Sequence, residues 1–398
     1  MPHPPPSLDI DPYATNVLLD PYAFHEALRK HPVVFLPAYD VYAIGRHAGA
    51  ALAFTDHEQF STTGGIGLGD ARKPGPNARP LNPLLEVDPP QHTALRHAVN
   101  KVLSPTAVRQ WRENMTRDAR ALVASLPAGA EVEAVESIVE EYVFKVFVDA
   151  VGIRFRKDAI KAIGNLNGNL TGPQNELLLQ AVRRAAPYVS WFEESQQREH
   201  VVPGGIAEQF FVLEDAGELP AGTASTLTRT FVRGGMDSTI AGIGSTLCHL
   251  ARNPAQWSSL RENPGRVRAA FEEGIRMETP FQVSYRLTTR PVVLDGMELD
   301  ADKKVGIFMG SANRDPERWT NPAAYDITRA TQGHLGFGVG AHNCIGQMIA
   351  RLEAECLLAA LLERFAGVEL AGDAAWRPVN QVRTLERLPL RLRETRPA

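Results

Sequence analysis

Apolar residues recur with helical spacing over most of the chain after Pro90. Positions three and four apart are apolar while the positions between them are polar or charged, which is the pattern of amphipathic helices packed on a core. The pattern predicts helices over roughly 91–103, 105–126, 135–152, 155–168, 174–196, 204–216, 220–252, 254–262 and 264–277, and a last one over about 344–366.

Short runs of β-branched and aromatic residues predict small sheets near both ends of the chain. These runs cover 33–36, 41–44, 292–294, 305–308 and 388–392. The dipeptide Asp295-Gly296, a strong hairpin turn, lies between the third and fourth runs and predicts that they pair. Gly64 to Pro83 is dense in glycine and proline and predicts a long irregular loop, a feature that is usually functional in compact domains.

Composition adds little to this mainly α picture with small β-sheets. Of the 398 residues, 44% are hydrophobic and 22% charged, as in ordinary globular proteins, and no linker or low-complexity stretch divides the chain. We therefore expect a single large domain over 1–398, in which residues 1–15 form an extended N-terminal arm.

The net charge and the number of cysteines limit which cellular location and which partners we expect. A net charge of -4 without a basic cluster gives no reason to expect nucleic acid. No run reaches the roughly 18 apolar residues of a membrane span, and the N-terminus has no signal-peptide pattern. Three cysteines make no disulfide framework, so we expect a cytoplasmic protein without a membrane segment.

One cysteine, Cys344, stands in a glycine-rich run just before the last predicted helix. The run is Phe337-Gly338-Val339-Gly340-Ala341-His342-Asn343-Cys344-Ile345-Gly346. A helix N-terminus favours thiolate over thiol, and a thiolate is both a nucleophile and a metal ligand. A buried core cysteine and a catalytic cysteine paired with His342 are the alternatives, although side chains two residues apart here would diverge.

The pattern Phe-x-x-Gly-x-His-x-Cys-x-Gly resembles the haem-binding loop of the cytochrome P-450 family, and the order of predicted elements is similar over nearly the whole chain. The resemblance implies the cytochrome P-450 fold and haem b, with Cys344 as the axial iron ligand. It also implies that Phe337, Gly338 and Gly346 shape the loop against the haem.

Two further motifs extend the resemblance to the support of this loop. Glu273 and Arg276 match the family's Glu-x-x-Arg pair, which by itself is common on helix surfaces. The stretch 313–319 between this pair and Cys344 resembles the family's meander, which implies a Glu-Arg-Arg cluster with Arg318 as its third member.

Charged residues in three other places match the family's partners of the haem propionates. His92 and Arg96 lie four apart on one predicted helix face, where charge-assisted hydrogen bonds can hold carboxylates, although an exposed basic face is the plain alternative. Arg286 and His342 match other propionate partners by position.

Two adjacent glycines lie inside the longest predicted helix, where each is unfavourable by roughly 1 kcal/mol. The run Arg233-Gly234-Gly235-Met236-Asp237-Ser238-Thr239 resembles the family's oxygen-activation motif. The resemblance implies that Asp237 and Ser238 are the acid and alcohol that pass protons, and a hydroxyl bonded four residues back would open the helix into a groove. Serine replaces the usual threonine, and its hydroxyl is less restricted. This puts in doubt the coupling, which is the fraction of reducing equivalents that reaches product and is not lost as peroxide.

Together these matches imply a monooxygenase that uses O2 and two electrons. No flavin or nicotinamide motif is present, so a ferredoxin with its NAD(P)H-dependent ferredoxin reductase is implied, docking near Arg96, His97, Lys101 and Arg109. A peroxide-driven peroxygenase on the same fold and a non-catalytic haem-binding sensor are the rival functions.

Several stretches look like the bacterial subgroup that oxidises para-substituted benzoates, often by O-demethylation. By alignment with that subgroup the pocket is wider and more polar, and we expect an aromatic carboxylic acid or a larger phenylpropanoid-like acid. Arg233 is the candidate carboxylate anchor, although it could instead pair with a glutamate of the fold. The other candidate substrate residues are Ile66, Leu68, Thr171, Val283 and Ser284, with Phe281 and Gln282 nearby.

Overall fold

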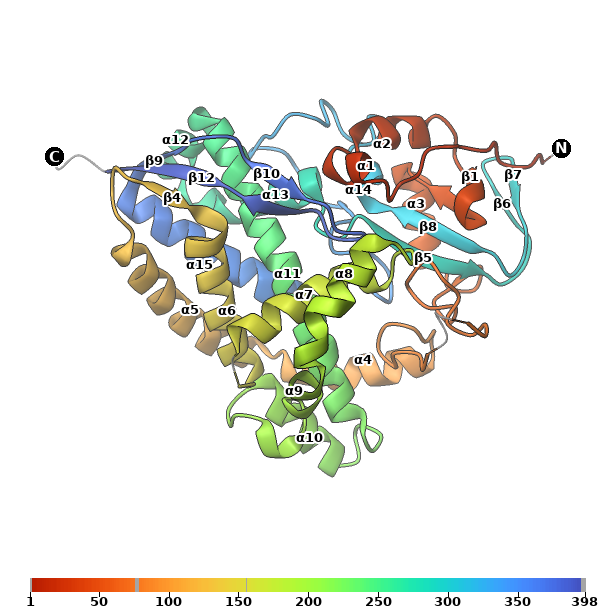
Figure 1. Cartoon of the computed structure of the whole chain (residues 1–398), viewed down its shortest axis with the longest axis horizontal. Coiled ribbons are helices and arrows are strands. Elements are labelled where there is room, and N and C mark those ends of the chain that lie inside the picture. Colours follow the sequence, from red (N-terminus) through yellow and green to blue (C-terminus); the bar gives the residue numbers. More distant parts are fainter. Residues whose placement is uncertain (1, 76–78, 155, 395–398) are drawn as a thin grey trace.

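Helices make up about half of the molecule, and small sheets lie in two regions of it (Figure 1). The computed structural model describes residues 2–75, 79–154 and 156–394. Figure 1 shows α5, α6 and α15 on the side of the C-terminus, the sheet with β5 and β8 on the side of the N-terminus, and α11 between them. The mainly α class with small sheets is confirmed.

The helices follow the apolar periodicity closely after residue 90. They are α1 Thr15–Leu19, α2 Tyr22–Arg29, α3 His47–Thr55, α4 Gln91–Val102, α5 Pro105–Ser125, α6 Glu141–Val151, α7 Lys157–Leu170, α8 Glu176–Ala185, α9 Val189–Glu194, α10 Ile206–Asp215, α11 Thr223–Arg252, α12 Pro254–Glu262, α13 Val267–Glu278, α14 Met309–Ala312 and α15 Gln347–Arg364. The helix expected over 174–196 is interrupted by a 3-10 turn, Ala186–Tyr188, because Pro187 cannot donate to the helical ladder.

The strands form four small sheets. Their bounds are β1 Val34–Leu36, β2 Val41–Ile44, β3 Phe60–Ser61, β4 Glu131–Glu133, β5 Val283–Thr288, β6 Val292–Leu294, β7 Met297–Leu299, β8 Lys304–Phe308, β9 Phe365–Leu370, β10 Ala375–Arg377, β11 Thr384–Arg387 and β12 Pro389–Glu394. The largest sheet has the order β1-β2-β8-β5-β3, and the others are β4-β12-β9, β10-β11 and β6-β7.

The hairpin at Asp295-Gly296 exists, but its predicted partner was wrong. Both turn residues have positive φ, 46° and 82°, so the turn is tight and joins β6 directly to β7, with Leu294 opposite Met297. The run 305–308 is β8, which pairs with β5 and β2 instead. The two-residue turn joins β6 to the strand that follows it at once, whereas pairing of 292–294 with 305–308 would need a much longer connection.

The long helix α11 runs through the middle of the fold and packs against α10, α13 and α6. Its glycines allow this close packing, because a Cβ at Gly235 would overlap the Phe147 ring and one at Gly242 would come within 2.6 Å of Ile275. Within the described residues no helix has the length and apolar character needed to cross a membrane.

Candidate active site

The Cys344 loop is fixed by its own backbone before α15 begins at Gln347. The Cys344 N–H donates to the Phe337 carbonyl at 2.7 Å, and Gly338 and Gly340 adopt positive φ of 64° and 76°, which glycine tolerates without strain. The Arg351 guanidinium covers the Phe337 ring at 4.4 Å from its centre. The loop is therefore a rigid turn that presents the sulfur at a helix entrance.

The protonation of the Cys344 thiol differs from the expectation. The backbone N–H groups of Gly346 and Gln347 and the charges of Arg96 and Arg351 favour the thiolate, but burial outweighs them and raises the pKa of the thiol. A bound cation lowers the pKa of a coordinating thiol far more than a helix end does. The helix entrance alone is thus too weak to produce the thiolate.

The two other cysteines lie inside the hydrophobic core. Cys248 on α11 is 1% exposed and Cys356 on α15 is 4% exposed, and burial raises the pKa of both thiols. Cys356 contacts the Thr116 hydroxyl at 3.4 Å. Both match the core positions that their helical stripes predict. Cys344 is therefore the cysteine that a backbone turn presents at the entrance of a helix.

Basic and polar groups without acceptors gather beside this loop. The rings of His92 and His342 lie 4.0 Å apart, and all four ring nitrogens are buried without a hydrogen-bond partner among the described residues. Burial, His92 and Arg286 lower the pKa of His342 to about 3. Burial also lowers the pKa of Arg286, 3% exposed, to about 10.

The acid nearest to this cluster is already engaged. Asp88 accepts hydrogen bonds from Ser61 at 2.5 Å and from the Thr62 hydroxyl at 2.8 Å. Within the part of the chain that the structure describes, Arg286 donates only from Nη1, to the Ser284 hydroxyl at 3.2 Å and the Tyr285 carbonyl at 2.9 Å. Buried donors in this state need an external acceptor, and the two carboxylates of haem fit this requirement.

Arg96 is placed differently from the other predicted propionate partners. Its Nη1 donates to the Asn343 carbonyl at 2.8 Å and its Nη2 to Asn343 Oδ1 at 2.7 Å. Arg96 therefore holds the residue just before Cys344, and its guanidinium stabilises the loop from α4.

The Glu273–Arg276 pair is fully buried, and its third partner is Arg329, not the expected Arg318. Arg276 donates to both Glu273 oxygens at 2.7 and 2.8 Å, and Arg329 Nε donates to Glu273 Oε1 at 2.9 Å. Arg318 instead donates to the Gln332 carbonyl and stacks on Trp319. The prediction was wrong because sequence order does not say which arginine of the meander turns inward.

The predicted oxygen-activation segment lies on α11 with its hydroxyls turned back to the helix. Ser238 donates to the Gly234 carbonyl and Thr239 to the Gly235 carbonyl, both at 2.7 Å. These bonds match the prediction, but α11 is continuous from Thr223 to Arg252, so the expected opening of the helix is absent.

Asp237 points toward α7, where a Cβ on Gly164 would collide with its carboxylate. Burial raises the pKa of Asp237 to about 6, the charge of Arg377 opposes the shift and that of Glu140 adds to it. The half-buried carboxyl therefore changes protonation near neutral pH.

Comparisons with known proteins agree with this geometry. The family model described as Cytochrome P450 matches residues 209–385. Cytochrome p450 CYP199A2 of Rhodopseudomonas palustris is 40% identical over 97% of this chain and 94% of its own length. The chain belongs to the cytochrome P450 family.

More distant relatives and solved structures give the same result. The P450 named 6-deoxyerythronolide B hydroxylase, of Saccharopolyspora erythraea, is 27% identical over 77% of this chain and 76% of its own length. The structure of CYP109Q5 from Chondromyces apiculatus matches with a TM-score of 0.81 at 29% identity, covering 97% of this chain and 99% of that one. The CxnD structure, at 23% identity and a TM-score of 0.83 over 100% of both chains, confirms the P450 fold. The protein is a P450 monooxygenase that binds haem b through a cysteine thiolate.

The segments that carry several predicted substrate residues are joined by backbone hydrogen bonds. The Ile66 carbonyl accepts from Tyr285 N at 3.0 Å, and Leu68 N donates to the Thr171 carbonyl at 2.9 Å. Gln381 N donates to the Gly168 carbonyl at 3.0 Å. These bonds link the end of α7 to the 379–383 turn and to the glycine-rich loop of residues 64–75 and 79–83, and they link this loop to β5.

Strand alternation separates two of the predicted substrate residues. On β5, Ser284 lies on the same face as Arg286, toward the two histidines, and Val283 lies on the opposite face with Tyr285. Val283 packs in the cluster with Phe24 and Leu28, so its predicted substrate role was wrong. Half-buried Phe281 instead joins Ala241 of α11, Val379 and Val382.

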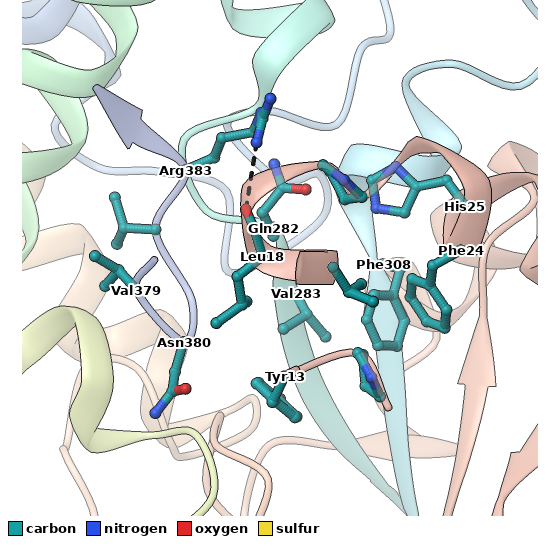
Figure 2. Close-up of a pocket in the computed structure, with 14 residues that line it drawn as sticks. Tyr13, Leu18, Phe24, His25, Gln282, Val283, Phe308, Val379, Asn380 and Arg383 are labelled. Carbon is teal, nitrogen blue, oxygen red and sulfur yellow. Dashed lines mark hydrogen bonds between the residues drawn. The ribbon is translucent and has the colours of Figure 1, made fainter. Parts of the chain in front are cut away.

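Figure 2 shows where Val283 points. A cavity of about 30 Å³ lies between the N-terminal segment, α2 and the 379–383 turn, with Tyr13, Leu18 and Val283 among its lining residues. Arg383 closes it by donating to the Leu18 carbonyl. This volume holds no more than a few waters, which is too little for an aromatic acid.

Arg233 lies one turn before Asp237 and has no acid bound to it. Its guanidinium lies over the Phe192 ring at 5.6 Å, and among the described residues it makes no ion pair. Burial lowers the pKa of Arg233, and the charges of Arg229 and Arg79 lower it further while Glu193 opposes them. The structure therefore favours a free anchor over a structural pair with a glutamate.

Lys304 was missed by the sequence analysis although it holds the glycine-rich loop. Its ammonium donates to the Gly64 carbonyl at 3.1 Å and the Gly65 carbonyl at 2.5 Å. Burial lowers the pKa of Lys304 to about 7. Glu86 holds the same loop by accepting from Ile66 N at 3.1 Å. The sequence carried one signal for this role, namely a lysine inside an otherwise apolar strand.

Proposed function

We propose that this P450 inserts one oxygen atom from O2 into an aromatic carboxylic acid, by hydroxylation or oxidative O-demethylation. The observation that carries the proposal is the unpaired Arg233 guanidinium one helical turn from Asp237 and Ser238. The resemblance of several stretches to the subgroup that oxidises para-substituted benzoates supports the same substrate class.

In this proposal Cys344 is the iron ligand, and His92, His342 and Arg286 hold the propionates. The support is the set of four buried ring nitrogens without hydrogen-bond partners among the described residues, together with the buried Arg286 guanidinium beside them. Haem, when bound, supplies the activation of O2 that a side chain alone cannot perform. Phe337, Gly338 and Gly346 shape the loop around the sulfur, and Ser284 orients Arg286 by accepting its hydrogen bond.

Asp237 and Ser238 move protons at the site. The Ser238 hydroxyl has one bond, to the Gly234 carbonyl, and can rotate away from it to donate elsewhere. Asp237, with a pKa of about 6, exchanges a proton readily near neutral pH and can refill a relay that includes Ser238. Because serine lacks the methyl group of threonine, this hydroxyl is less restricted.

The carboxylate of the substrate binds Arg233. Arg233 is exposed and has no ion-pair partner among the described residues, so its guanidinium is free to bind a carboxylate, and such charge-assisted bonds are about twice as strong as neutral ones. Ile66, Leu68 and Thr171 form the wall opposite, where the loop and α7 meet. The polar Thr171 can hydrogen-bond oxygen substituents on the ring, and Gly168 beside it packs closely against Val379.

Electrons come from a ferredoxin that docks over α4 and α5 beside the Cys344 loop, with an NAD(P)H-dependent ferredoxin reductase upstream. His97, Lys101 and Arg109 are exposed there, and Arg96 connects this surface to Asn343. We expect a cytoplasmic location, where such partners occur. Reduction by an acidic ferredoxin that slows as salt rises would support the docking surface.

Titration of the substrate-induced haem spin shift tests the anchor. Wild type and Arg233→Ala are titrated with 4-methoxybenzoate and its methyl ester, and formaldehyde is measured as the demethylation product. We expect the variant to lose about tenfold or more in affinity for the acid and little for the ester. Equal affinity of both proteins for the acid would sink the anchor, and turnover with peroxide alone at a comparable rate would favour a peroxygenase.

A further inference from the structure

Glu272 of α13 binds one residue that precedes the Cys344 loop and one that follows it. Its carboxylate accepts a hydrogen bond from His334 Nε2 at 2.7 Å and another from Arg351 Nε, and Arg351 Nη2 lies at 3.4 Å. The side chains of Glu272, His334 and Arg351 are 12%, 6% and 15% exposed. Charges that are buried to this degree are screened by salt much less than surface charges. These three residues are called the Glu272 cluster below.

His334 connects the cluster to the backbone at the start of the loop. Its Nδ1 accepts from the Gly336 N–H at 3.1 Å, so the ring hydrogen is on Nε2, which donates it to Glu272. Gly336 lies directly on α13, because a Cβ at this position would collide with the Ile275 side chain. The Glu272 carboxylate therefore helps to set the path of the backbone just before Phe337.

Arg351 connects the cluster to the same place from α15. Its guanidinium lies over the Phe337 ring, 4.4 Å from the ring centre, and its Nη1 donates to Gln347 Oε1 at 2.6 Å. The Phe337 carbonyl in turn accepts the Cys344 N–H at 2.7 Å. A chain of contacts thus leads from Glu272 through Phe337 to the residue that carries the sulfur.

The charges of the Glu272 cluster balance. Burial alone would raise the pKa of Glu272, but hydrogen bonds from His334 and Arg351 lower it to about 2, so the carboxylate is ionised at neutral pH. This negative charge offsets that of Arg351, which together with Arg96 favours a thiolate at Cys344. The pair therefore places almost no net charge beside the sulfur.

We propose that Glu272 is a positioning residue for the iron ligand, because it holds the Phe337 turn and keeps the Arg351 charge neutralised beside the sulfur. This inference rests on Cys344 being the ligand, as in the proposed function. Reduction adds one electron to the iron and its thiolate, so a positive charge nearby favours the reduced form and a negative charge favours the oxidised form. Removing either charge of the pair should therefore shift the reduction potential, in opposite directions.

The test measures the reduction potential of the haem-loaded protein by spectroscopic titration with dithionite and redox mediators. Glu272→Gln leaves Arg351 without its counter-charge, so we expect the potential to rise. Arg351→Gln leaves Glu272 without its counter-charge, so we expect the potential to fall. Each change should alter the ratio of reduced to oxidised haem at a fixed potential about three- to tenfold. The double variant should return close to wild type, which completes a double-mutant cycle for the pair.

Glu355→Gln is the matched control for the loss of one negative charge in the same region. Glu355 lies on α15 and, among the described residues, pairs with Arg112 at 3.0 Å and with exposed Arg268 at 3.8 Å. Arg268 also lies 3.8 Å from Glu272, but exposure to solvent screens its charge. We expect Glu355→Gln to change the ratio of reduced to oxidised haem by less than about twofold.

The sign of the shifts separates this role from a merely structural one. Loss of packing alone would move the potential the same way in Glu272→Gln and Arg351→Gln. Shifts in one direction, or shifts no larger than that of Glu355→Gln, would overturn the positioning role and leave the ligand assignment intact. If Cys344→Ser keeps the thiolate-type absorption of the carbon monoxide complex, the ligand assignment fails, and the positioning role fails with it.

Discussion

Replacement of Arg329 by alanine should destabilise this P450 much more than replacement of Arg318. Arg329 is 12% exposed in its side chain and donates to buried Glu273 at 2.9 Å. It also donates to the carbonyls of Thr320 at 2.6 Å, Asn321 at 3.1 Å and Ala324 at 3.1 Å. Arg318 makes a single bond, at 2.8 Å, to an exposed carbonyl.

The magnitude follows from these bonds. Breaking a buried ion pair by removing one partner costs about 3–5 kcal/mol, and each neutral hydrogen bond contributes about 1 kcal/mol. Because Arg276 and the Asp326 N–H still bind Glu273 after the change, we expect Arg329→Ala to cost about 3–4 kcal/mol. Arg318→Ala should cost about 1 kcal/mol or less.

Urea denaturation of the haem-loaded protein, followed by far-UV circular dichroism and by the haem absorption band, measures both changes. Arg329→Ala should lower the midpoint clearly and release haem at lower urea, because the meander that it holds leads into the Cys344 loop. If Arg318→Ala lowers the midpoint as much as Arg329→Ala, the assignment of the third cluster member is refuted.

Three further predictions concern the haem site and the glycine-rich loop. Cys344→Ser should abolish the thiolate-type absorption of the carbon monoxide complex while Cys356→Ser keeps it, and the reverse result would exclude Cys344 as the ligand. Ser238→Thr should raise product formed per NAD(P)H by limiting hydroxyl rotation, measured as product against peroxide; an unchanged ratio would contradict the rotamer argument. For Lys304, burial lowers the folded-state pKa from 10.5 to about 7, so the unfolded chain binds more protons between these values and stability rises with pH there. Lys304→Met should flatten this part of the pH profile in urea midpoints measured at pH 7 and 9, and an unchanged slope would count against the assignment.

Much of the helical part was predictable because its signals are local. Helical periodicity and the capping of α8 by Asn175, which accepts from Leu178 N at 3.2 Å, act within a few residues. The short helices α1, α2 and α3 were missed, since runs of five to nine residues carry little periodicity. The β6–β7 hairpin was predicted only in part. The sequence showed the turn at Asp295-Gly296 but not that β7 is the strand that pairs with β6.

Sequence by itself determined the elements whose physics is local: the amphipathic helices, the glycine turns of the Cys344 loop and the Glu273–Arg276 spacing on one helix face. Only the tertiary structure decided that Arg329 completes the cluster, that Ser284 and not Val283 faces the haem side, and that Arg233 makes no ion pair among the described residues. The reason is that long-range ion pairs and unsatisfied donors depend on where distant segments return in space. Local sequence places a charge on a helix face, but the packing of other segments decides whether that charge is neutralised.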